Sequence, residues 1–127
     1  NIAHRFTSHA GSSDYFKGGV VAYANEVKTD VLQVTPEDLE KFGAVSQQVV
    51  EQMAKGALQL LRTDTAIATS GIAGPSGGTP DKPVGTVWIA VCIKEKMISR
   101  LFHFGNTREQ IIQRTTQAAL VMLKEIL

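Results

Sequence analysis

The sequence predicts an α/β domain, a three-layer α/β/α sandwich around a mixed, mainly parallel β-sheet. Helix-like and strand-like apolar patterns alternate in the first half of the chain. A strand pair with a short charged turn follows, and a long amphipathic helix ends the sequence. The length of 127 residues, with 43% hydrophobic and 20% charged residues, fits one globular domain that spans residues 1–127.

The N-terminal half alternates helix and strand signals. Apolar residues recur at helical spacing from the first positions, and a Gly/Ser/Asp turn at residues 11–14 ends that helix. Residues 18–24 are expected to form a strand, opened by two glycines. Thr35 and the proline after it start a helix that ends at Gly43, because Thr caps helices and proline favours the first helical position. Ser46 caps the next, amphipathic helix.

The C-terminal half contains three strand-like stretches and a helix. Residues 65–69 form a short strand that runs into a long loop at residues 70–85. Residues 84–93 and 98–104 are predicted to form a hairpin. Thr107 opens the last helix, because a glutamine stands three residues later, as in a capping box.

Charge and composition exclude some classes of partner. Lys and Arg total 13 and Asp and Glu total 12, a net charge of +1, so broad attraction to nucleic acid or an acidic membrane is not expected. This charge balance does not exclude a local pocket that binds an anion. The longest apolar run, residues 87–93, is too short to span a bilayer. Cys92 has no partner for an internal disulfide, which favours a reducing cytoplasm, and the three histidines lack metal-ligand spacing.

The glycine-rich loop at residues 70–85 predicts a phosphate or nucleotide site. Glycine lets backbone N–H groups approach an anion closely. The alternative is an ordinary connecting loop, yet irregular loops of this length are more often functional. The candidate phosphate-binding glycines are Gly71, Gly74, Gly77 and Gly78.

Two sharper motif interpretations of this loop fail. The glycines around Ser76 match Gly-x-Ser-x-Gly, but a nucleophile elbow is followed at once by a helix, and here prolines follow. The loop also lacks the Gly-Lys-Ser/Thr ending of an ATP-binding P-loop. Neither a serine nucleophile at Ser76 nor an ATPase loop is predicted.

Tyr23 and Lys28 form a second group, at the end of the first predicted strand, where ligands gather in open α/β sheets. A desolvated lysine has a lowered pKa and can act as a base toward a serine hydroxyl, and a nearby tyrosine can relay the proton. The alternative is an ordinary solvated lysine. Arg108 lies in the first turn of the last helix, where the macrodipole disfavours a cation, which hints at phosphate binding.

Several separated segments together resemble one known family. Residues 18–28, 43–46, 70–75 and 82–89 are similar, in this order, to motifs of the C-terminal domain of the competence-damage-inducible protein CinA. That domain also occurs alone as nicotinamide-nucleotide amidase. The resemblance covers essentially the whole chain and is more specific than any one glycine loop.

The resemblance implies a bacterial enzyme of pyridine nucleotide recycling that hydrolyses the amide of nicotinamide mononucleotide to nicotinate mononucleotide and ammonia. The family uses a serine nucleophile activated by a lysine, with a tyrosine nearby and without a metal or cofactor. By motif, Tyr23 and Lys28 correspond to that tyrosine and lysine. Ser70 stands where members often have threonine and would play a supporting role, while Arg108 is a looser match to a phosphate contact.

One family motif is not in the sequence. The nucleophilic serine of the family lies in a Glu-Ser-Cys-Thr-Gly-Gly motif between the first strand and the first helix, and Asn1 begins a segment similar to that helix. The 127-residue sequence is therefore expected to lack the first strand and the nucleophile of the family. We expect the 127-residue chain to be inactive, because loss of such a nucleophile costs on the order of 10⁶ in rate. The unpaired sheet edge should favour self-association.

The partner expected from the resemblance is a small pyridine nucleotide, with no nucleic acid and no membrane, in a cytoplasmic protein that can form a homodimer. The alternative function is a non-catalytic nucleotide-binding or regulatory module. A mononucleotide that binds without turnover would favour that module.

Overall fold

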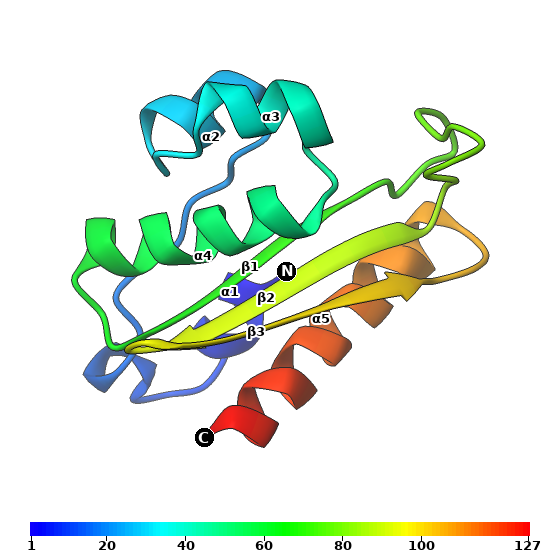
Figure 1. The fold of residues 1–127 in the computed structure, drawn as a ribbon. Helices are drawn as coiled ribbons and strands as arrows, with labels where there is room; N and C mark the ends of the chain where they lie inside the picture. The colour runs from blue at the N-terminus through cyan, green and yellow to red at the C-terminus, as the bar shows by residue number, and fades with distance from the viewer.

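In a computed structural model of residues 1–127, three strands form one antiparallel sheet in the order β1-β2-β3 (Figure 1). The strands are β1 (Thr65–Gly71), β2 (Thr86–Ile93) and β3 (Lys96–His103). Strands β2 and β3 form the predicted hairpin, which turns at the two residues between them. β2 lies in the centre and is buried along most of its length, as its apolar sequence predicts.

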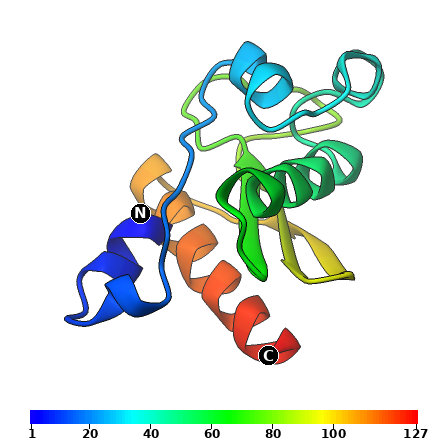
Figure 2. The same cartoon turned by 90° about the vertical axis from the view of Figure 1, so that its left-hand side faces the viewer.

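The two longest helices cover opposite faces of this sheet (Figures 1 and 2). Helix α4 (Gln47–Leu61) packs on β1 and β2 from one side, and α5 (Arg108–Ile126) packs on β2 from the other. None of the helices has both the length and the apolar character that a membrane crossing needs. The shorter elements are α1 (Ile2–Thr7), a 3₁₀ turn (Ser12–Asp14), α2 (Asn25–Asp30) and α3 (Pro36–Phe42).

Each face of the sheet has its own apolar core. Successive side chains of a strand point to opposite faces, so β2 contributes Ala90 and Cys92 to the α4 side and Ile89 and Val91 to the α5 side. On the α4 side the partners are buried residues of that helix and of the chain before α3. On the α5 side the partners are Ile111, Ala119 and Met122.

Helix starts are set by the capping residues that the sequence predicts. The hydroxyl oxygens of Thr35, Ser46 and Thr107 each accept a hydrogen bond from the backbone N–H three residues later, at 3.3 Å. Each bond satisfies one of the N–H groups that a helix start leaves free. The predicted starts of α3, α4 and α5 are therefore confirmed.

The expectation of a mainly parallel sheet is wrong. Both strand pairs are antiparallel, although helices do flank both faces. Parallel neighbours need a crossover that usually contains a helix, whereas the connection between β1 and β2 has no regular structure. The chain turns back through this loop and pairs directly.

The predicted strand at residues 18–24 is also not formed as a strand. The segment is irregular, and helix α2 follows it, which the sequence analysis did not predict. Its side chains still alternate. Val20 and Ala22 pack on the core under α4, whereas Val21 and Tyr23 are 86% and 85% exposed. The pattern of a half-buried strand is present, but no neighbouring strand pairs with it.

Candidate functional site

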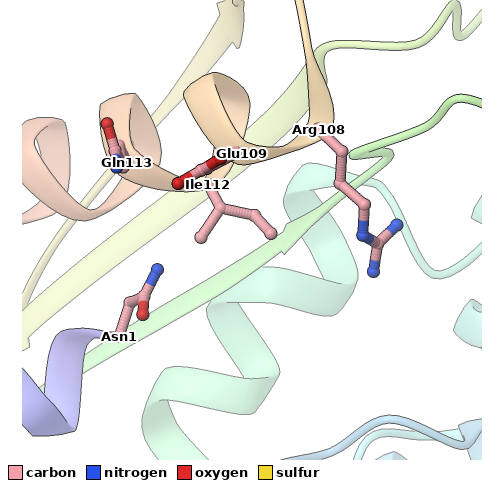
Figure 3. A pocket seen from close by; sticks show the side chains of 5 residues that line it. All are labelled: Asn1, Arg108, Glu109, Ile112 and Gln113. Carbon is pink, nitrogen blue, oxygen red and sulfur yellow. The ribbon is translucent and has the colours of Figure 1, made fainter.

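An open pocket of about 470 Å³ lies beside the start of α5 (Figure 3). Asn1 and Ile112 lie on its facing sides, and the side chain of Arg108 extends from the end of the helix away from both (Figure 3). Glu109 and Gln113 complete the lining. The pocket places one guanidinium, one carboxylate and the first turn of a long helix at a single location.

Arg108 connects this helix to the glycine loop. Its Nη1 donates a hydrogen bond to the carbonyl oxygen of Gly74 at 2.8 Å, so the structure brings two predicted phosphate-binding residues together. The other guanidinium N–H groups remain available, and N–H groups of the first turn of α5 have no partner within the helix. Together they favour an anion, and Glu109 opposes one.

The structure requires glycine at the predicted phosphate-binding positions for more than one reason. A Cβ at Gly71 would lie 2.7 Å from a methyl group of Val87, and a Cβ at Gly74 would lie 2.5 Å from a methyl group of Val84. Close packing thus excludes a side chain at both positions. Gly77 has a φ of +94°, and a Cβ there would meet only a methyl group of Ile72, at 3.7 Å, an ordinary van der Waals distance. Of these three glycines, only Gly77 combines a left-handed backbone with space for an added side-chain atom.

Lys28 is a buried lysine, only 6% exposed, in the last turn of α2. Its Nζ donates to the carbonyl oxygen of Ala22 at 2.8 Å, and no carboxylate forms a salt bridge with it. Burial lowers the pKa of Lys28 below the ordinary lysine value, because the charged form loses hydration. The alternative of a solvated surface lysine is therefore wrong. A desolvated amine without an acidic partner can act as a base.

Tyr23 and Lys28 are not joined by a hydrogen bond. Tyr23 is 85% exposed, and its hydroxyl makes no hydrogen bond within the chain. The short segment between them bends into α2, and the lysine side chain reaches back to the residue before Tyr23. The phenol thus faces solvent while the amine is buried.

Ser70 is held by the turn between α3 and α4. Its Oγ donates to the carbonyl oxygen of Ala44 at 2.7 Å. Two more donors bind the preceding carbonyls: Ser46 Oγ donates to Gly43 at 2.8 Å, and Lys82 Nζ donates to Phe42 at 2.6 Å. Lys82 was not among the site residues predicted from the sequence, and its only sequence signal was its place in residues 82–89, a segment similar to CinA.

The remaining nucleophile and metal-ligand candidates, Cys92, Ser76 and His103, show no arrangement for catalysis or metal binding. Cys92 is buried near the end of β2, where burial raises the pKa of its thiol, so it packs as a small apolar residue. Ser76 is exposed, and no helix follows it. His103 lies exposed at the end of β3.

These features define a small three-layer α/β domain with a buried basic amine and an anion-attracting helix start. A family model described as the CinA C-terminal domain matches residues 1–127. The chain belongs to this family, and the resemblance noted in the sequence is confirmed.

Relatives and solved structures agree with this assignment. A CinA-like protein of Fervidobacterium nodosum is 46% identical over 123 residues, and one of Shewanella piezotolerans is 49% identical over 124 residues. These matches cover 97% of this chain but only 30% and 29% of the relatives, so the chain spans about a third of their length or less.

Solved structures match across nearly all of the chain. A competence/damage inducible protein of Agrobacterium tumefaciens is 42% identical with a TM-score of 0.95, and covers 98% of this chain and 76% of its own. A CinA superfamily protein of Escherichia coli is 31% identical with a TM-score of 0.95, over 99% of this chain and 73% of its own. The architecture described above is that of the CinA superfamily.

Proposed function

We propose that this domain is an amidohydrolase that hydrolyses the amide of nicotinamide mononucleotide to nicotinate mononucleotide and ammonia. The observation that carries the proposal is the buried Lys28, whose amine has a lowered pKa and one backbone carbonyl as its only hydrogen-bond partner. A structural lysine in a core is usually paired with an acid. An unpaired, desolvated amine is suited to take a proton during a reaction.

In the proposed reaction the neutral amine of Lys28 accepts the proton of a serine hydroxyl. The serine oxygen attacks the amide carbon, the C–N bond breaks, and ammonia leaves with a proton returned from the lysine. Water then hydrolyses the acyl-enzyme ester and releases nicotinate mononucleotide and the free serine. The family places this serine in its Glu-Ser-Cys-Thr-Gly-Gly motif, which is not part of the 127-residue sequence.

The phosphate of the substrate is assigned to the start of α5 and the glycine loop. Arg108 holds the carbonyl of Gly74 with one N–H and offers its others to an anion. Gly77 has no side chain, and it is proposed as the point where the phosphate approaches the backbone. Ser70 supports this side of the site through Ala44, and Tyr23 is proposed as an exposed proton relay.

The second candidate is a module that binds a pyridine mononucleotide without turnover. The observation that favours it is the hydrogen bond from Arg108 to the glycine loop beside the start of α5, because binding of an anion there needs no nucleophile. The anion-attracting features at Arg108 would serve this function equally well.

The test is ammonia release from nicotinamide mononucleotide by the intact gene product and by the 127-residue chain. We expect turnover by the intact product and none by the isolated chain. Arg108→Met in the intact product should raise the KM by about a hundredfold, because a charge-assisted contact to phosphate is lost. Saturable binding of the mononucleotide by the intact product with no ammonia release would favour the binding module instead.

A further inference from the structure

The turn between α3 and α4 is held from three directions. The carbonyl oxygens of three consecutive residues, 42 to 44, each accept a hydrogen bond from a side chain of a different segment. Ser46 begins α4, Ser70 lies in β1, and Lys82 lies in the glycine loop. Phe42 is the last residue of α3, where the free carbonyls carry the negative end of the helix dipole, so an ammonium group is favoured there.

Lys82 is the one side chain of residues 75–85 that hydrogen-bonds outside the loop. The base of the loop is closed by backbone bonds between Ile72 and Gly85, and its tip by bonds between Thr79 and Lys82. The base is also bound to the sheet, because the backbone N–H of Phe104 donates to the carbonyl oxygen of Gly85. Beyond the base, two side chains connect the loop to other segments: Arg108 donates to Gly74, and Lys82 donates to the end of α3.

We propose that Lys82 is a positioning residue that holds the glycine loop against the end of α3 and so orders the loop for a phosphate group. The proposal deepens the function proposed above and rests on it. Gly43 fits this arrangement, because a Cβ there would stand 3.2 Å from the Lys82 amine and its φ of +80° disfavours other residues. The lysine does not touch the reacting amide in this role and acts through the loop.

The experiment compares four forms of the intact gene product: wild type, Lys82→Met, Lys82→Arg and Lys17→Met. Lys17 is the matched control, since its Nζ also donates to a carbonyl at the end of a helix, that of Arg62 after α4, away from the glycine loop. Each form is measured by hydrogen–deuterium exchange of residues 74–85 and by steady-state kinetics with nicotinamide mononucleotide.

For Lys82→Met we expect exchange of residues 74–85 about tenfold faster and a KM about tenfold higher, with kcat within about threefold, because one charge-assisted bond is lost. Lys82→Arg should restore both values, since a guanidinium can donate to the same carbonyl. Lys17→Met should change neither. A general loss of stability would instead speed exchange throughout the domain and leave the KM unchanged.

The proposal would be overturned if residues 74–85 of Lys82→Met exchanged at the wild-type rate, or if the KM of this variant stayed unchanged. If Lys82→Met does not fold, Lys82→Gln takes its place, because its amide is too short for the same contact. If the wild type releases no ammonia, the proposed function fails on its own. Lys82 is then judged by loop exchange and by the affinity for inorganic phosphate, which Lys82→Met should lower about tenfold and Lys82→Arg should not.

Discussion

The two groups of candidate residues, the anion-binding side around the glycine loop and the side of the proposed base Lys28, differ in how their backbone is held. On the anion-binding side, three consecutive carbonyls of the turn before α4 each have a side-chain donor, and Arg108 holds Gly74. On the side of the base, residues 18–23 make no backbone hydrogen bond, and their one hydrogen bond is from Lys28 to Ala22. One side is held by side-chain hydrogen bonds from four segments, whereas the other has a single hydrogen bond, from one amine, beside the packing of Val20 and Ala22 on the core.

On the anion-binding side, the residues that hold the backbone are not the ones that would carry out the reaction. On the side of the base, one residue would do both. Lys82, Ser70 and Ser46 hold the anion-binding side, and none of them is needed as the proton acceptor. Lys28 must both bind Ala22 and accept the proton in the proposed reaction. A neutral amine can still donate to the carbonyl through its remaining hydrogens, so the two tasks are compatible.

The largest expected effect comes from Lys28→Met in the intact gene product. Ammonia release should fall by at least about 10³-fold, because the proposed base is removed. The free energy of unfolding should change by no more than about 1 kcal/mol, since the lost bond to Ala22 is offset by removal of a buried charge. Urea unfolding and an ammonia assay measure the two quantities.

The pH dependence of the wild type sharpens this test. Only the neutral amine accepts a proton, so kcat/KM should rise with pH and reach a plateau. The apparent pKa of this rise should lie below the ordinary lysine value of 10.5. The unfolded chain binds more protons than the folded one between that lowered pKa and 10.5, so wild-type stability should rise with pH there relative to Lys28→Met. Lys28→Arg, which keeps a donor but stays charged, should be inactive at every pH; activity in it would remove Lys28 as the base.

The same comparison explains what the sequence could predict. The caps at Thr35, Ser46 and Thr107 were predictable because a cap depends on residues within one turn. The strand at residues 18–24 was not, although its alternation is visible, because a strand exists only where another pairs with it. The antiparallel direction of β1 and β2 depended in the same way on a distant pairing.

The same holds for the candidate site residues: their local sequence predicts some of their properties, and distant contacts set the others. Lys28 was chosen from its position after an apolar stretch and from the resemblance, but its burial comes from packing that no local pattern shows. Lys82 bonds to Phe42 across 40 positions of sequence, so nothing beside it in the chain marks the contact. Tyr23 was expected beside Lys28, and its exposure follows from the bend into α2 that was not predicted.

A smaller effect is expected from Ser70→Ala, which breaks one contact of the well-held side. Loss of the hydroxyl leaves the Ala44 carbonyl without its side-chain donor in a partly buried place, and this should lower the free energy of unfolding by about 1–2 kcal/mol. Ser70→Thr should keep most of that stability because the hydroxyl remains. Ser76→Ala, in an exposed position without a hydrogen bond, is the control and should change it by less than about 0.5 kcal/mol.

The smallest effect is expected from Tyr23→Phe, on the side that few contacts hold. The phenol is 85% exposed and without a hydrogen bond in the chain, so the free energy of unfolding should stay within about 0.5 kcal/mol of wild type. The kcat for ammonia release should fall by less than about tenfold, because a water molecule can take the place of an exposed relay hydroxyl.

The size of that kcat change shows whether the segment that carries Tyr23 stays exposed to solvent or closes over the bound substrate. A loss of 10²-fold or more would mean that residues 18–24 close over the substrate and shield the hydroxyl from water, since a shielded proton donor has no substitute. Tyr23→Phe with hydrogen–deuterium exchange of this segment, with and without nicotinamide mononucleotide, separates the two. Slower exchange on binding together with a large loss of kcat would show that the substrate itself orders the segment whose one hydrogen bond in the free protein comes from Lys28.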